Sequence, residues 1–114
     1  MTAQELYDTG FAARCDGRYR EAKLYLEQVV SMDPHHTKAH WQLALIKGFE
    51  GDFDGSLADL KRLNQQNPND LDILNDLGMT YNMLGYPDEA CETFARILHI
   101  NPDHENARRQ LAYC

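Results

Sequence analysis

Residues 71–104 read LDILNDLGMTYNMLGYPDEACETFARILHINPDH, and a glycine and a proline of this stretch recur along the whole chain. The recurring positions are evenly spaced, at Gly17, Gly51 and Gly85 and at Pro34, Pro68 and Pro102. Self-similarity with a period of this length, about 34 residues, predicts a solenoid in which each repeat is one supersecondary element stacked on its neighbour.

Each repeat carries two apolar stripes with the spacing of an α-helix. In the first repeat, one stripe precedes the glycine and the other follows it, at Leu6, Gly10 and Ala13 and at Ala22, Leu26 and Val29. The repeat is therefore predicted to be a helical hairpin. Its glycine ends the first helix, because a positive φ costs glycine least, and its proline ends the second.

The sequence also predicts how the hairpins pack and how their helices begin. Small residues on the two helices are expected to face each other and allow a close approach: Gly10 with Ala22, Ala44 with Ser56, and Gly78 with Ala90. Short polar side chains are expected as N-caps, Asp54 and Asp88 for second helices, and Asn69 or Asp70, and Asp103, for the next hairpins.

The third repeat carries the clearest family pattern, at Leu74, Leu77, Gly78, Tyr81, Ala90, Phe94 and Pro102. With this pattern the chain resembles the tetratricopeptide repeat family. The other repeats depart more from it, with Thr9 and Ala13 in the first and His40, Lys47 and Ser56 in the second. The resemblance implies an all-α fold, an α-solenoid of three tetratricopeptide-type hairpins with a C-terminal capping helix, about seven antiparallel helices in a right-handed superhelix.

We expect a single domain over residues 1–114. Its repeats are predicted at about 3–36, 37–70 and 71–104, and residues 105–114 are predicted to form the cap helix, because Ala107, Leu111 and Ala112 keep the register. Three repeats meet the usual minimum for a stable solenoid.

Composition limits the partners and the location. The net charge is −7, and only short basic groups occur, so nucleic acid is not expected as a partner. No apolar stretch is long enough for a signal peptide or a membrane span, so we expect no membrane association and a cytoplasmic location. Cys15, Cys91 and Cys114 are odd in number without close pairing, which favours free thiols.

The strongest functional signal is an apolar set one residue beyond the buried stripe of each first helix. In proteins that this chain resembles, first helices line a concave groove that binds partner peptides or helices. The candidate groove residues are Tyr7, Phe11, Trp41, Leu45, Phe49, Asn75, Met79, Asn82 and Met83. Aromatic and methionine side chains suit the anchoring of a partner's apolar groups, and the two amides suit its backbone. Alternatively, the apolar members fill contacts between repeats and the amides are merely solvated.

One subgroup of the family grips the terminal carboxylate of chaperone tails with lysines, asparagines and an arginine. The corresponding positions here hold Tyr7, Phe11, Leu45, Asp72 and Asp76, and the two aspartates have the wrong sign for a carboxylate. We therefore predict no binding to acidic C-terminal chaperone tails.

The chain shows no pattern typical of a cofactor, metal or catalytic site. His35, His36 and His40 lie close in sequence but in a linker and at a packing position, so no metal is expected. Without a phosphate loop or nucleophile motif, we expect no cofactor and no enzyme activity. The favoured function is an interaction module, an adaptor or co-chaperone. The alternative is a scaffold that associates with itself to form a homo-oligomer, through the exposed flank of the first hairpin or through the C-terminal cap helix, where Leu111 and Tyr113 would form the exposed patch.

Overall fold

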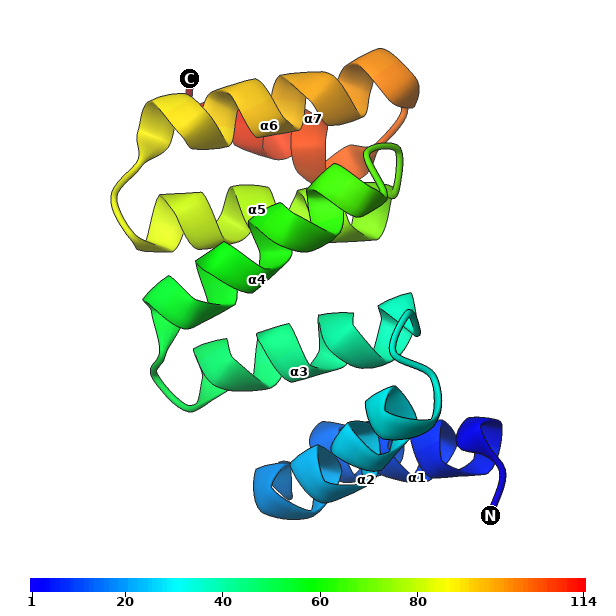
Figure 1. The fold of residues 1–114 in the computed structure, drawn as a ribbon. Helices are drawn as coiled ribbons and strands as arrows, with labels where there is room; N and C mark the ends of the chain where they lie inside the picture. Colours follow the sequence, from blue (N-terminus) through cyan, green and yellow to red (C-terminus); the bar gives the residue numbers. More distant parts are fainter. The chain divides into compact units, whose positions relative to one another are not determined.

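The computed structural model describes residues 1–114 and consists of α-helices without a strand (Figure 1). The helices are α1 (Ala3–Cys15), α2 (Tyr19–Met32), α3 (Thr37–Phe49), α4 (Phe53–Gln66), α5 (Leu71–Met83), α6 (Pro87–Ile100) and α7 (Glu105–Leu111). Equivalent helices among α1 to α6 begin and end one repeat period apart, and α7 begins one period after α5. The period read from glycines and prolines thus sets the helix boundaries. None of the helices is long and apolar enough to cross a membrane.

The chain divides into two compact units, residues 1–59 and 60–114, with the boundary inside α4. Unit 1 contains α1, α2, α3 and the beginning of α4, and unit 2 contains the rest of α4 with α5, α6 and α7. The expectations of a single domain and of a right-handed superhelix stay predictions.

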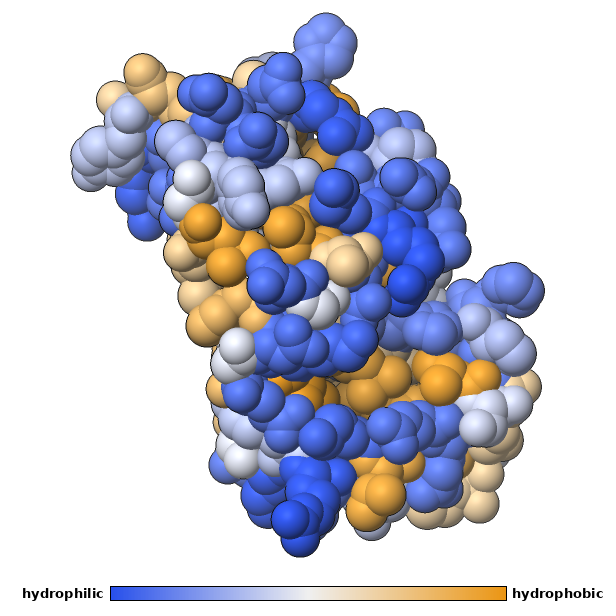
Figure 2. Space-filling model, turned by 60° about the vertical axis from the view of Figure 1, so that its left-hand side comes forward, coloured by the Kyte–Doolittle hydropathy of each residue, from blue (hydrophilic) through white to orange (hydrophobic).

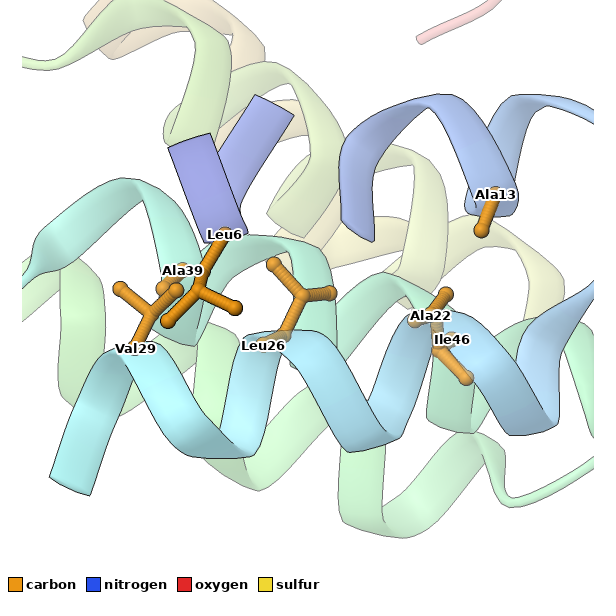
Figure 3. Packing of buried hydrophobic residues seen from close by; sticks show 7 residues of the cluster. All are labelled: Leu6, Ala13, Ala22, Leu26, Val29, Ala39 and Ile46. Atoms are coloured by element: carbon orange, nitrogen blue, oxygen red, sulfur yellow. The ribbon is translucent and has the colours of Figure 1, made fainter. Parts of the chain in front are cut away.

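Unit 1 is built around the hairpin of α1 and α2, and α3 packs against both of these helices. The stripes predicted from the sequence meet in its core (Figure 3), which is formed by Leu6, Ala13, Ala22, Leu26, Val29, Ala39 and Ile46. Burial of these side chains is the main stabilising term of the unit, since a fully buried leucine, isoleucine or valine contributes about 1.5–3 kcal/mol, and an alanine less.

Unit 2 repeats the hairpin with α5 and α6, and the short α7 packs on α6. Its core cluster is formed by Leu74, Ala90, Phe94, Ile97 and Ala107, and Leu111 of α7 packs half-buried against it. An isolated helix of this short length is not stable in water, so α7 depends on this packing.

The expected pairing of small residues across each hairpin is wrong at the two buried glycines. A Cβ atom on Gly10 would lie 3.0 Å from Cγ of Leu26, and one on Gly78 would lie 2.7 Å from Cζ of Phe94. The two pairs are equivalent in the repeat, two periods apart. The glycine therefore makes room for the large residue one turn beyond the expected alanine, because the antiparallel register places that side chain opposite it.

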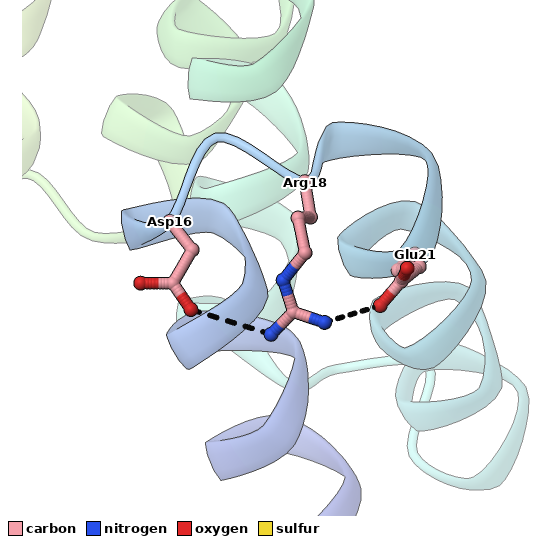
Figure 4. Close-up of polar contacts among 3 residues, drawn as sticks. All are labelled: Asp16, Arg18 and Glu21. Carbon is pink, nitrogen blue, oxygen red and sulfur yellow. Dashed lines mark hydrogen bonds and ion pairs between the residues drawn. The ribbon is translucent and has the colours of Figure 1, made fainter.

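The turns between paired helices have the predicted glycines. Gly17, Gly51 and Gly85 have φ values of 78°, 95° and 82°, a conformation that side-chain-bearing residues rarely adopt. The residue after each glycine donates its N–H to a carbonyl near the end of the preceding helix, as in Arg18 to Ala13 at 2.8 Å. This bond closes a Schellman motif. Beside the first turn, the exposed Arg18 side chain bridges Asp16 and Glu21 (Figure 4).

The predicted N-caps are partly wrong. Asp70 caps α5 as expected, accepting from the N–H groups of Asp72 and Ile73. The equivalent positions before α3 and α7 hold His36 and His104, whose Nδ1 atoms accept from Ala39 at 3.0 Å and Ala107 at 3.2 Å. His104 therefore takes the role predicted for Asp103. A histidine cap was not expected because the usual cap residues carry a side-chain oxygen.

The N-caps predicted for the second helices are also displaced. Asp54 lies in the first turn of α4, and the side chain of Asp52 accepts from the Gly55 N–H at 2.9 Å instead. Asp88 lies in the first turn of α6, whose cap residue, Tyr86, makes no side-chain cap bond. Both aspartates still place negative charge at the positive end of a helix.

The prediction of three free thiols is wrong for two of them. Cys91 on α6 and Cys114 form a disulfide across a sequence separation of 23, whereas Cys15 is free and exposed. The odd number of cysteines left one unpaired but did not exclude a bridge between the others. Packing of α7 on α6 brings the two distant cysteines together, and this contact is not visible in cysteine spacing.

Candidate partner-binding surfaces

The candidate groove residues divide between the units. Unit 1 holds Tyr7 and Phe11 on α1 and Trp41, Leu45 and Phe49 on α3. Unit 2 holds Asn75, Met79, Asn82 and Met83 on α5. All nine lie on first helices of hairpins, so two surfaces can be described, one on each unit.

Aromatic rings gather on α1 and α3 of unit 1. Phe11 stacks on Tyr7 with ring centroids 6.1 Å apart, and Tyr7 lies 5.3 Å from the ring of His36. Phe49 stacks on Tyr19 at 5.5 Å. Phe11 is 39% exposed and Phe49 53% exposed. Two phenyl rings thus remain open to solvent, where they can contact a partner.

Arg14 joins these two rings, although it was not among the predicted site residues. Its guanidinium carbon lies 5.3 Å from the ring centroid of Phe11 and 5.7 Å from that of Phe49. We call Phe11, Arg14 and Phe49 the aromatic–arginine face. The spacing of three between Phe11 and Arg14 on one helix was a usable signal, but the prediction selected apolar and amide residues.

Tyr7 is partly structural. It is half-buried and packs against the core of unit 1. Burial raises the pKa of the Tyr7 phenol, and a hydrogen bond with the side chain of Gln42 opposes that shift. Trp41 and Leu45 are also half-buried. The packing alternative therefore applies in part to these three residues, and among the candidates on unit 1 it applies least to Phe49, which is the most exposed.

On unit 2, two methionines are exposed and two amides are held by α7. Met79 is exposed and Met83 is 63% exposed. The Oδ1 atom of Asn75 accepts from Nδ2 of Asn106, and Nδ2 of Asn82 donates to Oε1 of Gln110 at 3.4 Å. The amides predicted for a partner's backbone therefore already bond within the chain, since α7 lies close enough to reach them.

Polar and apolar groups alternate on the surface. Figure 2 shows one face of the molecule, where apolar side chains (orange) reach the surface between hydrophilic ones (blue). Unit 2 has a depression of about 180 Å³, lined by charges of both signs, among them Lys61, Glu89, Glu92 and Arg96.

No group of three or more His, Cys, Asp or Glu side chains is placed to hold a metal ion. The histidines near Pro34 have structural contacts. His36 caps α3, and Nε2 of His40 lies 2.8 Å from the carbonyl oxygen of Pro34. Each contact engages one ring nitrogen of its histidine in local structure.

Helical hairpins that recur at a constant interval define a helical-repeat protein. Family models described as tetratricopeptide repeat match residues 50–114 and residues 16–36. The chain belongs to the tetratricopeptide repeat family, as its third repeat predicted.

Solved structures with the same fold confirm the all-α helical-repeat class. The first tetratricopeptide domain of Spaghetti (RPAP3), bound to the HSP90 peptide SRMEEVD, has a TM-score of 0.86 and 20% identity, covering 97% of this chain and 90% of that one. YrrB, a tetratricopeptide protein with an unusual peptide-binding site, has a TM-score of 0.82 and 24% identity, covering 96% and 56%. MamA has a TM-score of 0.83 and 21% identity, covering 96% and 64%.

Two curated relatives are larger proteins. The human and mouse aspartyl/asparaginyl beta-hydroxylases are each 40% identical over 55 residues. This match covers 48% of the present chain and 7% of each hydroxylase. The chain thus matches only a small part of their length.

Proposed function

We propose that this protein is an interaction module that binds a peptide or helix of a partner protein and acts as an adaptor or co-chaperone rather than as an enzyme. The observation that carries the proposal is the exposure of Phe11 and Phe49 around Arg14 on unit 1. Large side chains left open on a rigid helical scaffold are the usual anchors of a protein interface.

Peptide binding described for two similar proteins supports the proposal. The Spaghetti (RPAP3) domain is described with a bound peptide, and YrrB with a peptide-binding site. The acidic HSP90 peptide SRMEEVD of the first case is not expected to bind here. Asp72 and Asp76 of this chain have the charge of the peptide itself, and Tyr7, Phe11 and Leu45 offer it no positive charge.

Self-association is the second candidate. Tyr113 is 85% exposed beside the C-terminus, which favours contact between copies through the cap helix. The accompanying Leu111 is half-buried and packs against the core cluster of unit 2. Tyr113 alone therefore remains exposed from the cap-helix patch, which weakens this one of the two predicted routes to self-association. The two exposed rings around Arg14 make partner binding the better supported function.

The test is capture of partners from a lysate of the source cells, with bound proteins identified by mass spectrometry. The bait is compared with a Phe11→Ala, Phe49→Ala double variant. Leu24→Ala with Met32→Ala is the matched control, because both side chains are exposed on α2, whereas the two rings belong to α1 and α3. We expect at least one protein to be retained by the bait and the control and lost from the double variant, since hot-spot truncations cost about 2 kcal/mol each.

Equal capture by all three baits would contradict a role for the aromatic–arginine face. Recovery of the bait alone would favour self-association. Circular dichroism spectra and melting temperatures of the three proteins must agree, so that a loss of capture reports on binding and not on folding.

A further inference from the structure

We infer that the aromatic–arginine face recognises one acidic side chain, Asp or Glu, inside an otherwise apolar segment of a partner protein. This inference rests on the proposed function and specifies the chemistry of its ligand. It depends on Arg14, which has no counterpart in the predicted groove set.

Arg14 is a half-buried cation without a carboxylate partner. Three other cations of unit 1 are paired, Arg18 with Asp16 and Glu21, Lys23 with Glu50, and Lys47 with Asp59. The polar contact of Arg14 is a distant one, from Nη2 to Sγ of Cys15 at 3.7 Å, and its buried Nε has no hydrogen-bond partner. A partly desolvated charge of this kind gains most from an added carboxylate.

The ring contacts hold the guanidinium in place for such a ligand. Packing against Phe11 and Phe49 restricts the Arg14 side chain before binding, which lowers the entropy lost on binding. A guanidinium is planar and binds a carboxylate through two parallel N–H groups. The exposed parts of the two rings supply apolar contact beside that ion pair. The fitting ligand therefore has one carboxylate with large apolar neighbours.

The charge of unit 1 excludes a strongly acidic ligand. Residues 1–59 contain 10 Asp and Glu against 6 Lys and Arg, a net charge of −4. Arg14, the single arginine of the aromatic–arginine face, cannot offset several approaching carboxylates against this field. An acidic run or tail is thus disfavoured, whereas a single carboxylate in an uncharged segment is accepted.

The first test is selection from a phage-displayed library of random dodecapeptides on the full chain. We expect enriched peptides to contain one Asp or Glu beside large apolar residues. Enrichment of peptides without an acidic residue would overturn the inference but leave the proposed function standing. Failure to enrich any peptide would count against both.

The second test measures affinity by fluorescence anisotropy with an enriched peptide and its Glu→Gln or Asp→Asn counterpart. The acidic peptide is expected to bind the wild-type chain about tenfold more tightly than its amide counterpart. In the Arg14→Gln variant this preference should disappear, and Arg14→Lys should restore part of it. Arg20→Gln, which removes the same charge from an exposed position on α2, should keep the full preference.

A peptide preference that survives in Arg14→Gln would overturn the inference. The inference would also be overturned if the amide peptide bound the wild-type chain as tightly as the acidic peptide. That comparison uses only the wild-type chain, so it does not depend on whether a protein variant folds.

Discussion

His36, Asp70 and His104 occupy the same position in successive repeats, and each precedes a first helix that it caps. Nitrogen and oxygen acceptors thus perform the same task, satisfying an N–H that the first turn of a helix leaves unpaired. The ring of His36 also packs against the ring of Tyr7, with the two ring centroids 5.3 Å apart. A substitution at this position therefore tests two roles of one side chain.

Replacing His36 with Ala is expected to lower the free energy of unfolding by about 1 kcal/mol, the usual contribution of an N-cap. His36→Asp should retain most of it, because Asp70 already caps α5 from the equivalent position. Urea unfolding of both variants measures this difference. An equal loss in the two would assign the contribution to the ring contact with Tyr7 instead.

Gly78 has the closest contact of any buried glycine, with Cζ of Phe94 only 2.7 Å from where its Cβ would lie. Alanine favours a helix over glycine by up to about 1 kcal/mol, but the fully buried Phe94 ring has nowhere to move. We expect Gly78→Ala to destabilise the chain by about 1–2 kcal/mol through overpacking.

Gly48→Ala is the control, because the Cβ there meets the small Ser56 side chain at 3.3 Å. Its free energy of unfolding should change by less than that of Gly78→Ala. A Gly78→Ala chain as stable as wild type in urea would show that α5 and α6 separate easily, and the hairpin packing described here would be wrong.

At the scale of the helices, the sequence predicts boundaries better than contacts. The boundaries follow from glycines and prolines that act locally, and they repeat in every hairpin. Contacts such as that between Gly78 and Phe94 depend on the antiparallel register, which apolar spacing does not specify. The same holds for the amides of α5, since their bonds to Asn106 and Gln110 arise only once α7 packs.

The candidate site likewise divides into residues that local sequence pattern predicts and residues that only the three-dimensional contacts reveal. Phe11 and Phe49 could be predicted as site residues for two reasons. Their positions lie beyond the buried stripe of each first helix, and their aromatic side chains suit contact with a partner. Arg14 was missed because the prediction selected apolar and amide residues; its spacing of three from Phe11 was visible in the sequence, whereas its partial burial and its lack of a carboxylate partner required the structure. The nine-residue site as a whole stays a prediction, and Arg14 adds a residue to it.

At the scale of the whole chain, the Cys91–Cys114 disulfide is the one covalent link between distant residues. Closing a loop of this length restricts the unfolded chain and contributes about 3 kcal/mol to stability in the chain-entropy model. We expect reduction, or Cys91→Ser with Cys114→Ser, to lower the free energy of unfolding by about this amount. Cys15→Ser, which removes the free exposed thiol, should leave it unchanged.

The same bond bears on the location of the protein. A cytoplasmic location stays a prediction from the sequence, yet disulfides persist mainly in oxidising compartments. Thiol labelling of the protein under denaturing conditions, directly after acid quenching of source cells, distinguishes a cytoplasmic location from an oxidising compartment. One reactive thiol per chain, at Cys15, would place the protein in an oxidising compartment. The disulfide would then contribute its share of the free energy of unfolding in the cell. Three reactive thiols would support the cytoplasm, and α7 would then be held on α6 by Ala107 and Leu111 without the covalent bond.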